Sequence, residues 1–261
     1  MTGKTILITG ANRGIGRGLF DHYAAQPGNT VVAAVRDPTR CRAELEAQSP
    51  RGAGTRLLVV GLDATSSASP SRAADELRAA GVGRLDVVVA NAGVGKVARL
   101  EDASVADVET VVKVNGVAPL FLYQAMLPLM RAAAAAAKDA GEEGATLPVF
   151  ALISSGGGSI AEAATSDAFA LGVYGGSKAL ANFLTVKMGA ENDWLITLCI
   201  APGLVATDMA KLAEDSGIDF KVVGKTPQAC AENTAHIIKN ATKEEHSGKF
   251  FNETIDKFHA W

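Results

Sequence analysis

A tyrosine and a lysine stand four residues apart in the segment Tyr174-Gly-Gly-Ser-Lys178. On a helix, side chains at this spacing project from one face, so we expect the ammonium to lie near the phenol oxygen. A nearby positive charge favours the phenolate and should lower the tyrosine pKa from its usual value of about 10. The pair could then act as a general acid near neutral pH. A surface helix can carry these two residues by chance, so the interpretation depends on the rest of the chain.

A glycine-rich segment near the start of the chain has the composition of a nucleotide site. It reads Thr9-Gly-Ala-Asn-Arg-Gly-Ile-Gly16, after an apolar run at Thr5–Thr9 and before an apolar-periodic segment that reaches Tyr23. This order predicts a strand, a tight turn and a helix. Glycines let the backbone approach a pyrophosphate, and the helix N-terminus offers N–H groups to it. An ordinary glycine-rich loop is the alternative.

The end of the second predicted strand carries both charges that discriminate between the two nicotinamide dinucleotides. Thr30–Val35 is apolar after its first residue, as a buried parallel strand should be, and Arg36 and Asp37 follow it. A carboxylate there would bind a ribose 2′-hydroxyl, whereas an arginine accommodates a 2′-phosphate. Because Arg36 comes first and Arg13 could supply a second cation, we expect NADPH. Two ordinary surface arginines are the alternative.

Small or polar residues follow the later predicted strands as well. They are Asp63, Asn91-Ala-Gly93, Ser154-Ser155 and Pro202-Gly203. We expect those strands at 56–60, 85–90, 148–153 and 194–200, with a last one at 249–252. Ligands bind at the carboxyl ends of the strands in an open α/β sheet, so these residues should share one edge.

Helical patterns alternate with the strands throughout. They cover residues 40–50, 70–80, 103–113 and 174–190, with two stretches in 206–240 that break near 217–226. Asn115 interrupts a long apolar segment that continues to Ala137. With no domain break or internal repeat, the pattern predicts an α/β fold: one domain over 1–261, with a doubly wound parallel sheet of about seven strands and helices on both faces.

Composition narrows the class of protein. The 261 residues are 48% hydrophobic and 20% charged, with a net charge of −3, which indicates neither nucleic-acid nor anionic-membrane binding. We find no run of eighteen apolar residues and no signal peptide, and expect no membrane span. Cys41, Cys199 and Cys230 are spaced too widely for a metal site or a disulfide framework, so we expect a cytoplasmic protein without a metal.

Taken together, these motifs resemble the short-chain dehydrogenase/reductase family over nearly the whole chain. The match rests on the order of the glycine-rich segment, Asp63, Asn91-Ala-Gly93, Asn115, Ser155, the Tyr174–Lys178 pair and Pro202-Gly203. The phrases Ala34-Val-Arg-Asp-Pro38 and Pro202-Gly-Leu-Val-Ala-Thr-Asp208, with Trp194-Leu, are similar to fungal norsolorinic-acid-ketoreductase-like and sniffer-like carbonyl reductases. The resemblance implies a Rossmann-type fold.

The resemblance also implies residue roles. Tyr174 would protonate the carbonyl oxygen, Lys178 would lower the tyrosine pKa and hold the nicotinamide ribose, and Ser155 would hydrogen-bond the substrate oxygen. Ser154 is the weaker candidate, being one residue deeper in the strand. Asn115 would anchor a water in a proton relay to Lys178. Asp63 would meet the adenine, Asn91 the cofactor ribose region, and Val205 and Thr207 the carboxamide end. The other implied contacts with NADPH/NADP+ are Gly10, Asn12, Arg13, Gly14, Ile15, Gly16, Arg36, Ala64, Ala92, Gly93, Tyr174, Lys178, Pro202 and Gly203.

We therefore expect an NADPH-dependent reductase of ketones or aldehydes. An alcohol dehydrogenase working in oxidation and a non-enzymatic NADPH-binding sensor stay open. Ser155 and Tyr174 are nineteen residues apart, longer than is usual in that family, which should reshape a substrate region expected at 154–173 and 203–226. In the family the helices of 105–137 and 174–190 pair across a twofold axis, so a homodimer or homotetramer is implied.

Overall fold

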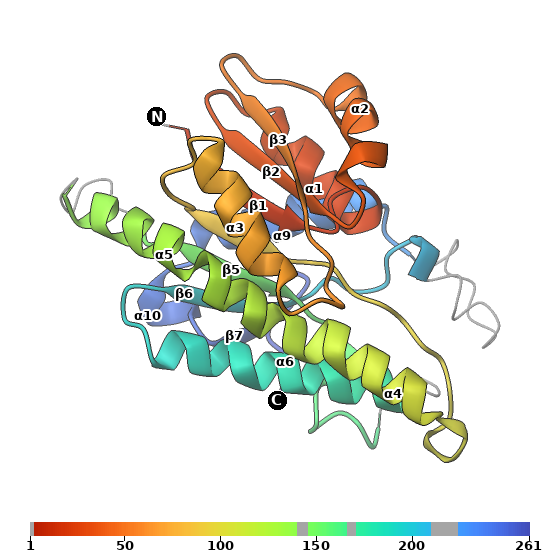
Figure 1. The fold of residues 1–261 in the computed structure, drawn as a ribbon. Coiled ribbons are helices and arrows are strands. Elements are labelled where there is room, and N and C mark those ends of the chain that lie inside the picture. The colour runs from red at the N-terminus through yellow and green to blue at the C-terminus, as the bar shows by residue number, and fades with distance from the viewer. Residues whose placement is uncertain (1–2, 140–145, 166–170, 210–223) are drawn as a thin grey trace.

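The computed structural model describes residues 3–139, 146–165, 171–209 and 224–261 (Figure 1). Within them, seven parallel strands form one sheet in the order β3-β2-β1-β4-β5-β6-β7. The strands are β1 (Thr5–Thr9), β2 (Thr30–Val35), β3 (Arg56–Gly61), β4 (Val87–Ala90), β5 (Val149–Ile153), β6 (Ile196–Ala201) and β7 (Lys249–Asn252). This confirms the predicted doubly wound parallel sheet.

Helices connect the strands and cover both faces of the sheet. They are α1 (Gly14–Ala24), α2 (Pro38–Gln48), α3 (Ser69–Ala79), α4 (Val105–Val111), α5 (Ala118–Asp139), α6 (Gly172–Ala190), α9 (Pro227–Asn240) and α10 (Lys243–His246), with short turns η1 (Leu100–Asp102), η2 (Val112–Val117) and η3 (Gly156–Gly158). Several begin where the sequence provides a cap: the side chains of Asp37, Ser104 and Thr226 accept backbone N–H bonds at the starts of α2, α4 and α9.

Two cores lie on the two faces of the sheet. On one face α1, α2 and α9 pack against strand residues such as Ile6 and Ile8. On the other, α3, α5 and α6 pack against Leu7 and Phe150, and these helices stand in front of the sheet in Figure 1. Successive residues of a buried strand point into the two cores in turn. Both sets of side chains are therefore apolar, and the strand sequence is a continuous apolar run rather than an alternation of apolar and polar residues.

The crossing of α1 and α9 is close because of one glycine. A Cβ at Gly18 would lie 2.8 Å from the carbonyl oxygen of Pro227, at the start of α9. A larger residue would push the two helices apart, and with them the glycine-rich loop that leads into α1. Gly18 therefore fixes the position of the loop as well as the helix packing.

The predicted strand boundaries are correct for β1, β2 and β7 and slightly wrong elsewhere. β4 begins at Val87 rather than residue 85, because the backbone of Leu85 bonds to Leu129 in α5 instead of entering the ladder. β6 begins at Ile196 rather than 194, because a turn closed by Leu195 N–H and Asn192 C=O precedes it. The expected break at 217–226 lies mostly outside the described residues.

The apolar segment around Asn115 also differs from the prediction. The helix is not interrupted there but widens into a π-helical turn, η2, between α4 and α5. Pro119 has no N–H and cannot bond the carbonyl of Asn115 four residues earlier, so the α-helical hydrogen-bond ladder is disrupted at this point. Such turns are frequent at functional sites.

One continuous helical stretch, Val105–Asp139, is long and apolar enough to cross a membrane by length and composition, with a mean hydropathy of 1.3 in its most apolar window. The search for an unbroken run of eighteen apolar residues did not detect this stretch. In the fold, Met126 and Met130 of this stretch are fully buried against the sheet. Burying side chains of that size stabilises the layer by roughly 1.5–3 kcal/mol each. Here the stretch is a core helix of an α/β fold, and core helices pass the same test.

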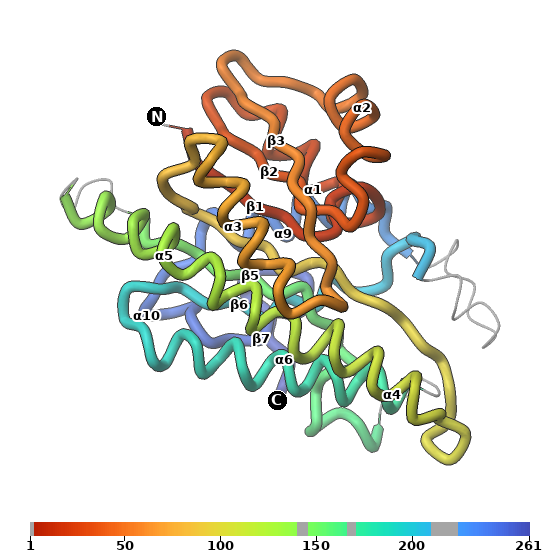
Figure 2. Tube along the Cα trace, in the orientation of Figure 1, coloured from red at the N-terminus to blue at the C-terminus, as the bar shows by residue number. Residues whose placement is uncertain are grey.

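The strand order reverses between β1 and β4, as the chain trace in Figure 2 allows the reader to follow. From β1 the chain builds outward through β2 to β3, and then returns to build β4 to β7 on the other side. The crevice at such a switch point, beyond the carboxyl ends of the strands, is where α/β sheets bind ligands. The loops after β1, β4, β5 and β6 all start at this edge.

Candidate active site

Tyr174 and Lys178 lie in the first two turns of α6, as predicted. Lys178 is 5% exposed, and its ammonium donates a hydrogen bond of 2.7 Å to the carbonyl oxygen of Ile153 at the end of β5. The same nitrogen lies 5.8 Å from the centre of the Tyr174 ring. The half-buried Tyr174 is hydrogen-bonded to the side chain of Ser155. The helix thus brings all three predicted side chains together at the end of β5.

The direction of the tyrosine pKa shift was predicted wrongly. Burial raises the pKa of Tyr174 to about 12, and the hydrogen bond to Ser155 offsets this only in part. Burial likewise lowers the pKa of Lys178 to about 8. Desolvation dominates both pKa shifts, and the hydrogen bond of the Lys178 ammonium goes to the Ile153 carbonyl. The phenol therefore holds its proton at neutral pH.

Ser155 and Ser154 have different environments, which supports the choice of Ser155. Ser154 is 3% exposed, and its hydroxyl donates a 2.6 Å hydrogen bond to Asn182 in α6. Ser155 is more open, and its Oγ accepts the Gly157 N–H at 3.2 Å, which caps the turn η3. Ser154 thus joins strand to helix, while Ser155 faces Tyr174.

Asn115 connects the loop after β4 to the catalytic helix. Its Oδ1 accepts the Val94 N–H at 2.9 Å, and its Nδ2 donates to the Val94 carbonyl at 2.9 Å and to Ser177 Oγ at 3.1 Å. Ser177 in turn donates to the Tyr174 carbonyl at 2.6 Å. Asn115 is 1% exposed. The predicted water relay stays a prediction, but the side chain clearly braces the helix turn that carries Tyr174 and Lys178.

The glycine-rich loop forms a cradle that only glycine fits. Gly10 and Gly14 have φ of 66° and 56°, in the left-handed region. A Cβ at Gly16 would lie 2.4 Å from the Gly10 carbonyl oxygen and 2.5 Å from Asn91 Nδ2. The turn is therefore tight, the N-terminus of α1 opens onto it, and both features fit the pyrophosphate of a dinucleotide. The chemistry and spacing of the loop match the implied cofactor.

Asn91 acts within the protein instead of pointing freely at a ligand. Its Nδ2 donates to the Thr9 carbonyl at 2.8 Å, and the backbone N–H groups of Asn91 and Ala92 both donate to Thr9 Oγ1 at 2.9 Å. These bonds join the end of β4 to the end of β1. The predicted contact of Asn91 with the cofactor ribose stays a prediction, and its observed role is to shape the floor of the crevice.

The two charged residues at the end of β2, Arg36 and Asp37, have different roles. The carboxylate of Asp37 accepts the Arg40 N–H at 3.0 Å and caps α2. Arg36 is exposed, and its charge helps to hold the pKa of Asp63 below the usual range, after the hydrogen bonds from Thr65. Arg36 thus adds positive charge beside the predicted adenine side of the site.

The segment after β6 lies against the glycine-rich loop. Thr207 Cγ2 would be 3.3 Å from a Cβ at Gly14, and Arg13 pairs with Asp208 at 3.2 Å. The buried Val205 forms an isolated bridge with Lys225. The glycine-rich loop and the segment after β6 are therefore in contact through Gly14 and Arg13. The remaining predicted contacts, also at this edge, are Asn12, Ile15, Ala64, Gly93, Pro202 and Gly203.

Sequence reasoning missed several residues that build the site. Thr9 and Ser177 hold the crevice and the helix turn, and both stand inside quoted motifs, so their positions gave a usable signal. His259 lies against Gly156, beside Ser155, and no local pattern indicates this contact. The predicted substrate region is only partly visible, because residues 166–170 and 210–223 lie outside the described residues. Within the described part of the chain, no cluster of His, Cys, Asp and Glu could hold a metal.

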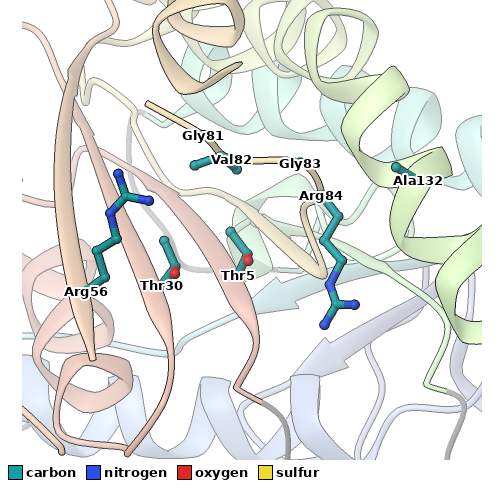
Figure 3. Close-up of a pocket in the computed structure, with 8 residues that line it drawn as sticks. All are labelled: Thr5, Thr30, Arg56, Gly81, Val82, Gly83, Arg84 and Ala132. Atoms are coloured by element: carbon teal, nitrogen blue, oxygen red, sulfur yellow. The ribbon is translucent and has the colours of Figure 1, made fainter. Parts of the chain in front are cut away.

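A pocket of about 280 Å³ lies at the opposite edge of the sheet (Figure 3). Its lining includes the first residues of three strands, Thr5, Thr30 and Arg56. Arg56 donates to the Ala80 carbonyl at 2.6 Å, and Arg84 pairs with Asp86 at 3.4 Å, so both cations are engaged. We assign the chemistry to the carboxyl edge of the sheet.

The chain is similar to known proteins over its whole length. The family described as short chain dehydrogenase matches residues 4–216. The short chain dehydrogenase gsfK of Penicillium aethiopicum is 39% identical, covering 94% of this chain and 95% of that protein. Norsolorinic acid ketoreductase nor1 of Dothistroma septosporum is 34% identical over 94% of this chain and 88% of that protein. An NADPH-bound carbonyl reductase from chicken fatty liver has a TM-score of 0.84 at 27% identity, covering all of both chains.

Proposed function

We propose that this chain, which belongs to the short chain dehydrogenase family, reduces a ketone or aldehyde to an alcohol with NADPH. Oxidoreductase chemistry on carbonyl or alcohol groups follows from the family. The direction of reduction is our inference from relatives that are named ketoreductase and carbonyl reductase. The observation that carries the proposal is the Tyr174 hydroxyl, hydrogen-bonded to Ser155 beside the buried Lys178.

Tyr174, Ser155 and Lys178 have different roles at the substrate oxygen. Tyr174 and Ser155 both hydrogen-bond the carbonyl oxygen, which polarises the bond and orients the carbonyl carbon. The bound nicotinamide supplies the hydride that this carbon accepts. Tyr174 gives its proton to the oxygen as negative charge develops there, which completes the alcohol. The Lys178 ammonium stabilises the tyrosinate that remains, before Tyr174 regains a proton from solvent.

Turnover with a panel of carbonyl compounds tests the reaction. The purified protein should consume NADPH, followed by loss of nicotinamide absorbance, with at least one aromatic or aliphatic ketone or aldehyde. Product analysis should show one alcohol formed for each NADPH consumed. Consumption of NADPH without alcohol formation, or rapid oxidation of alcohols with no carbonyl reduction at neutral pH, would contradict the proposal.

We also propose that NADPH binds more tightly than NADH. Arg36 is exposed at the end of β2, where a guanidinium can pair with a 2′-phosphate in a charge-assisted bond. The carboxylate of Asp37, which could have accepted a ribose hydroxyl, is engaged in capping α2. Arg13, which could supply a second cation, is exposed and pairs with Asp208.

Dissociation constants for both cofactors test this preference. Arg36→Ala should weaken NADPH binding by roughly ten- to a hundredfold, since a hydrogen bond to a charged group contributes about 1.5–3 kcal/mol. NADH binding should hardly change. Arg51→Ala removes an exposed arginine at the start of the loop before β3 and is the matched control. A wild type that prefers NADH, or an unchanged ratio in Arg36→Ala, would show that Arg36 does not face a 2′-phosphate.

A reducing compartment such as the cytoplasm is part of the proposal. Cys41, Cys199 and Cys230 are the three cysteines of the chain, and all are free thiols. Burial raises the pKa of Cys230 to about 11 and also raises that of Cys199, so neither is a reactive thiolate at neutral pH. Free, unreactive cysteines are typical of proteins in reducing compartments.

A further inference from the structure

We propose that His259 is a positioning residue for the reduction proposed above: it holds the turn η3 so that Ser155 faces the Tyr174 hydroxyl. The inference deepens that function and rests on it for its kinetic tests. Ser155 Oγ accepts the Gly157 N–H, and the Gly158 N–H donates to the Ser155 carbonyl at 2.8 Å. The serine and the turn therefore move as one unit.

Two of the three glycines of η3 are fixed by the catalytic helix. The Gly157 carbonyl oxygen would lie 2.3 Å from a Cβ at Gly175, which places it directly against α6. A Cβ at Gly158 would lie 2.9 Å from Lys178 Cβ. The helix that carries Tyr174 thus determines where the far end of the turn sits.

The remaining glycine, Gly156, is next to Ser155 and is held by His259. A Cβ at Gly156 would lie 3.2 Å from His259 Cε1 and 3.4 Å from Nε2, so the ring packs directly against the glycine. The His259 side chain is only 13% exposed. Because Gly156 has no side chain, the ring contacts the backbone itself and limits its movement.

Three contacts fix the His259 ring. Its backbone N–H donates to the Phe250 carbonyl at 2.8 Å, which attaches it to β7. Its ring centre lies 4.8 Å from that of Phe250, which is 1% exposed. Its Nδ1 lies 3.1 Å from Glu162 Oε2. The ring is therefore rigid relative to the sheet, as a positioning residue must be.

The loop after η3 is bound to the same segment. Ser159 Oγ donates to the Ala260 carbonyl at 2.7 Å, and the Ala161 N–H donates to the Trp261 carbonyl at 2.7 Å. Trp261 stacks on Phe250, with ring centres 5.4 Å apart. Residues 259–261 thus clamp both the turn and the loop that follows Ser155, although they lie about a hundred residues away in sequence.

Kinetics of His259→Ala test the proposal. Loss of the ring frees Gly156, and a displacement of about 1 Å at a reacting group can lower the rate by roughly a hundredfold. We expect kcat to fall by about ten- to a hundredfold, while the dissociation constant of NADPH changes less than about twofold. His259→Phe retains a flat ring against Gly156 and should recover most of kcat.

A double-mutant cycle separates positioning from general destabilisation. If His259 acts through Ser155, His259→Ala should change kcat less than about twofold in a Ser155→Ala background. His246→Ala is the matched control. The His246 side chain is 14% exposed, and its ring stacks on Phe251. Phe251 follows Phe250 in β7 and lies in the core on the other face of the sheet. The control should lose stability like His259→Ala but keep its kcat.

Three results would overturn the proposal. They are an unchanged kcat in His259→Ala, an equal loss of kcat with and without Ser155, and an equal loss of kcat in His246→Ala. Crystal structures of wild type and His259→Ala give a readout independent of activity: η3 and Ser155 Oγ should be displaced from Tyr174. If the turn superposes on that of the wild type, His259 does not position it, whether or not the wild type reduces ketones.

Discussion

Lys178 brings its ammonium into the interior of the protein, where the carbonyl oxygen of Ile153 accepts a hydrogen bond from it. Burial lowers the pKa of this lysine to about 8, against 10.5 in the unfolded chain. The unfolded chain therefore binds more protons between these two pH values, and the group makes folding more favourable as pH rises through that window.

This difference predicts the pH dependence of Lys178→Met. Without cofactor, the free energy of unfolding of the wild type should rise relative to the variant by about 1.4 kcal/mol per pH unit between pH 8 and 10.5. Urea unfolding at a series of pH values measures it. Burial raises the pKa of Tyr174 to about 12, so this phenol stays protonated in the folded protein over this pH window. A constant difference from pH 7 to 10.5 would mean that Lys178 keeps its ordinary pKa.

At the residue scale, the identity of the candidate site residues was predictable from the sequence, whereas the pKa shift of Tyr174 was not. Tyr174, Lys178, Ser155 and Asn115 stand in motifs, and the fold brings them together. The pKa shift of Tyr174 depends on burial and on the direction of the Lys178 ammonium, and both are set by β5 and α6 rather than by the spacing of the pair.

At the scale of elements, α6 contains two adjacent glycines with opposite roles. A Cβ at Gly175 would lie 2.3 Å from the Gly157 carbonyl oxygen, whereas one at Gly176 would meet nothing within 4 Å. Gly176→Ala should therefore stabilise the protein by roughly 0.5–1 kcal/mol, the ordinary helix preference for alanine.

Gly175→Ala should do the reverse. The clash is with backbone, so either α6 or η3 must shift, and the distance between Tyr174 and Ser155 changes with it. We expect a loss of stability and at least a tenfold loss of kcat, measured by thermal unfolding and turnover. Equal behaviour of the two alanine variants would show that α6 and η3 are not in the close contact described.

Element boundaries were predictable where the sequence marks them on both sides. β1 and β2 are apolar runs that end at a glycine and at charged residues, and both were predicted to the residue. The π turn at Asn115 was not predicted, because a polar residue in an apolar segment looks like a break. The pairing of Asn115 with Pro119 four residues later was the available signal.

For the whole molecule, we propose that two copies pair through the outer face of α4 and α6. Large apolar side chains are exposed there: Val105 by 74%, Phe183 by 66%, Val108 by 37% and Leu180 by 36%. Only 33% of the most apolar window in the adjoining stretch Val105–Asp139 is buried. Exposed apolar groups gathered on neighbouring helices are typical of interaction surfaces.

Phe183→Glu tests this surface. A charge at the centre of a symmetric interface is repeated on both subunits, so the variant should sediment as a monomer at micromolar concentration where the wild type is a dimer or tetramer. Ile160→Glu is the control, because Ile160 is 75% exposed but lies away from both helices in sequence. A monomeric wild type, or a variant with unchanged mass, would contradict the pairing.

The general architecture was predictable because alternating strands and helices leave few alternatives. Contacts between distant segments were not. Arg13 pairs with Asp208, almost two hundred residues further along the chain, and His259 contacts Gly156 from the far end of the sequence. Such pairings depend on how β6 and β7 complete the sheet, and single-sequence patterns carry no signal for them.

The most direct test of the account compares turnover and cofactor binding in Tyr174→Phe. The ring still packs on Lys178 but has no proton to give, so the rate of NADPH-dependent carbonyl reduction should fall by roughly a hundred- to ten-thousandfold. NADPH affinity, measured by nicotinamide fluorescence, should stay close to that of the wild type. Tyr123→Phe, which loses only a hydrogen bond from Asn192, should keep its rate. A Tyr174→Phe variant that retains more than about a tenth of the wild-type rate would show that Tyr174 is not the acid.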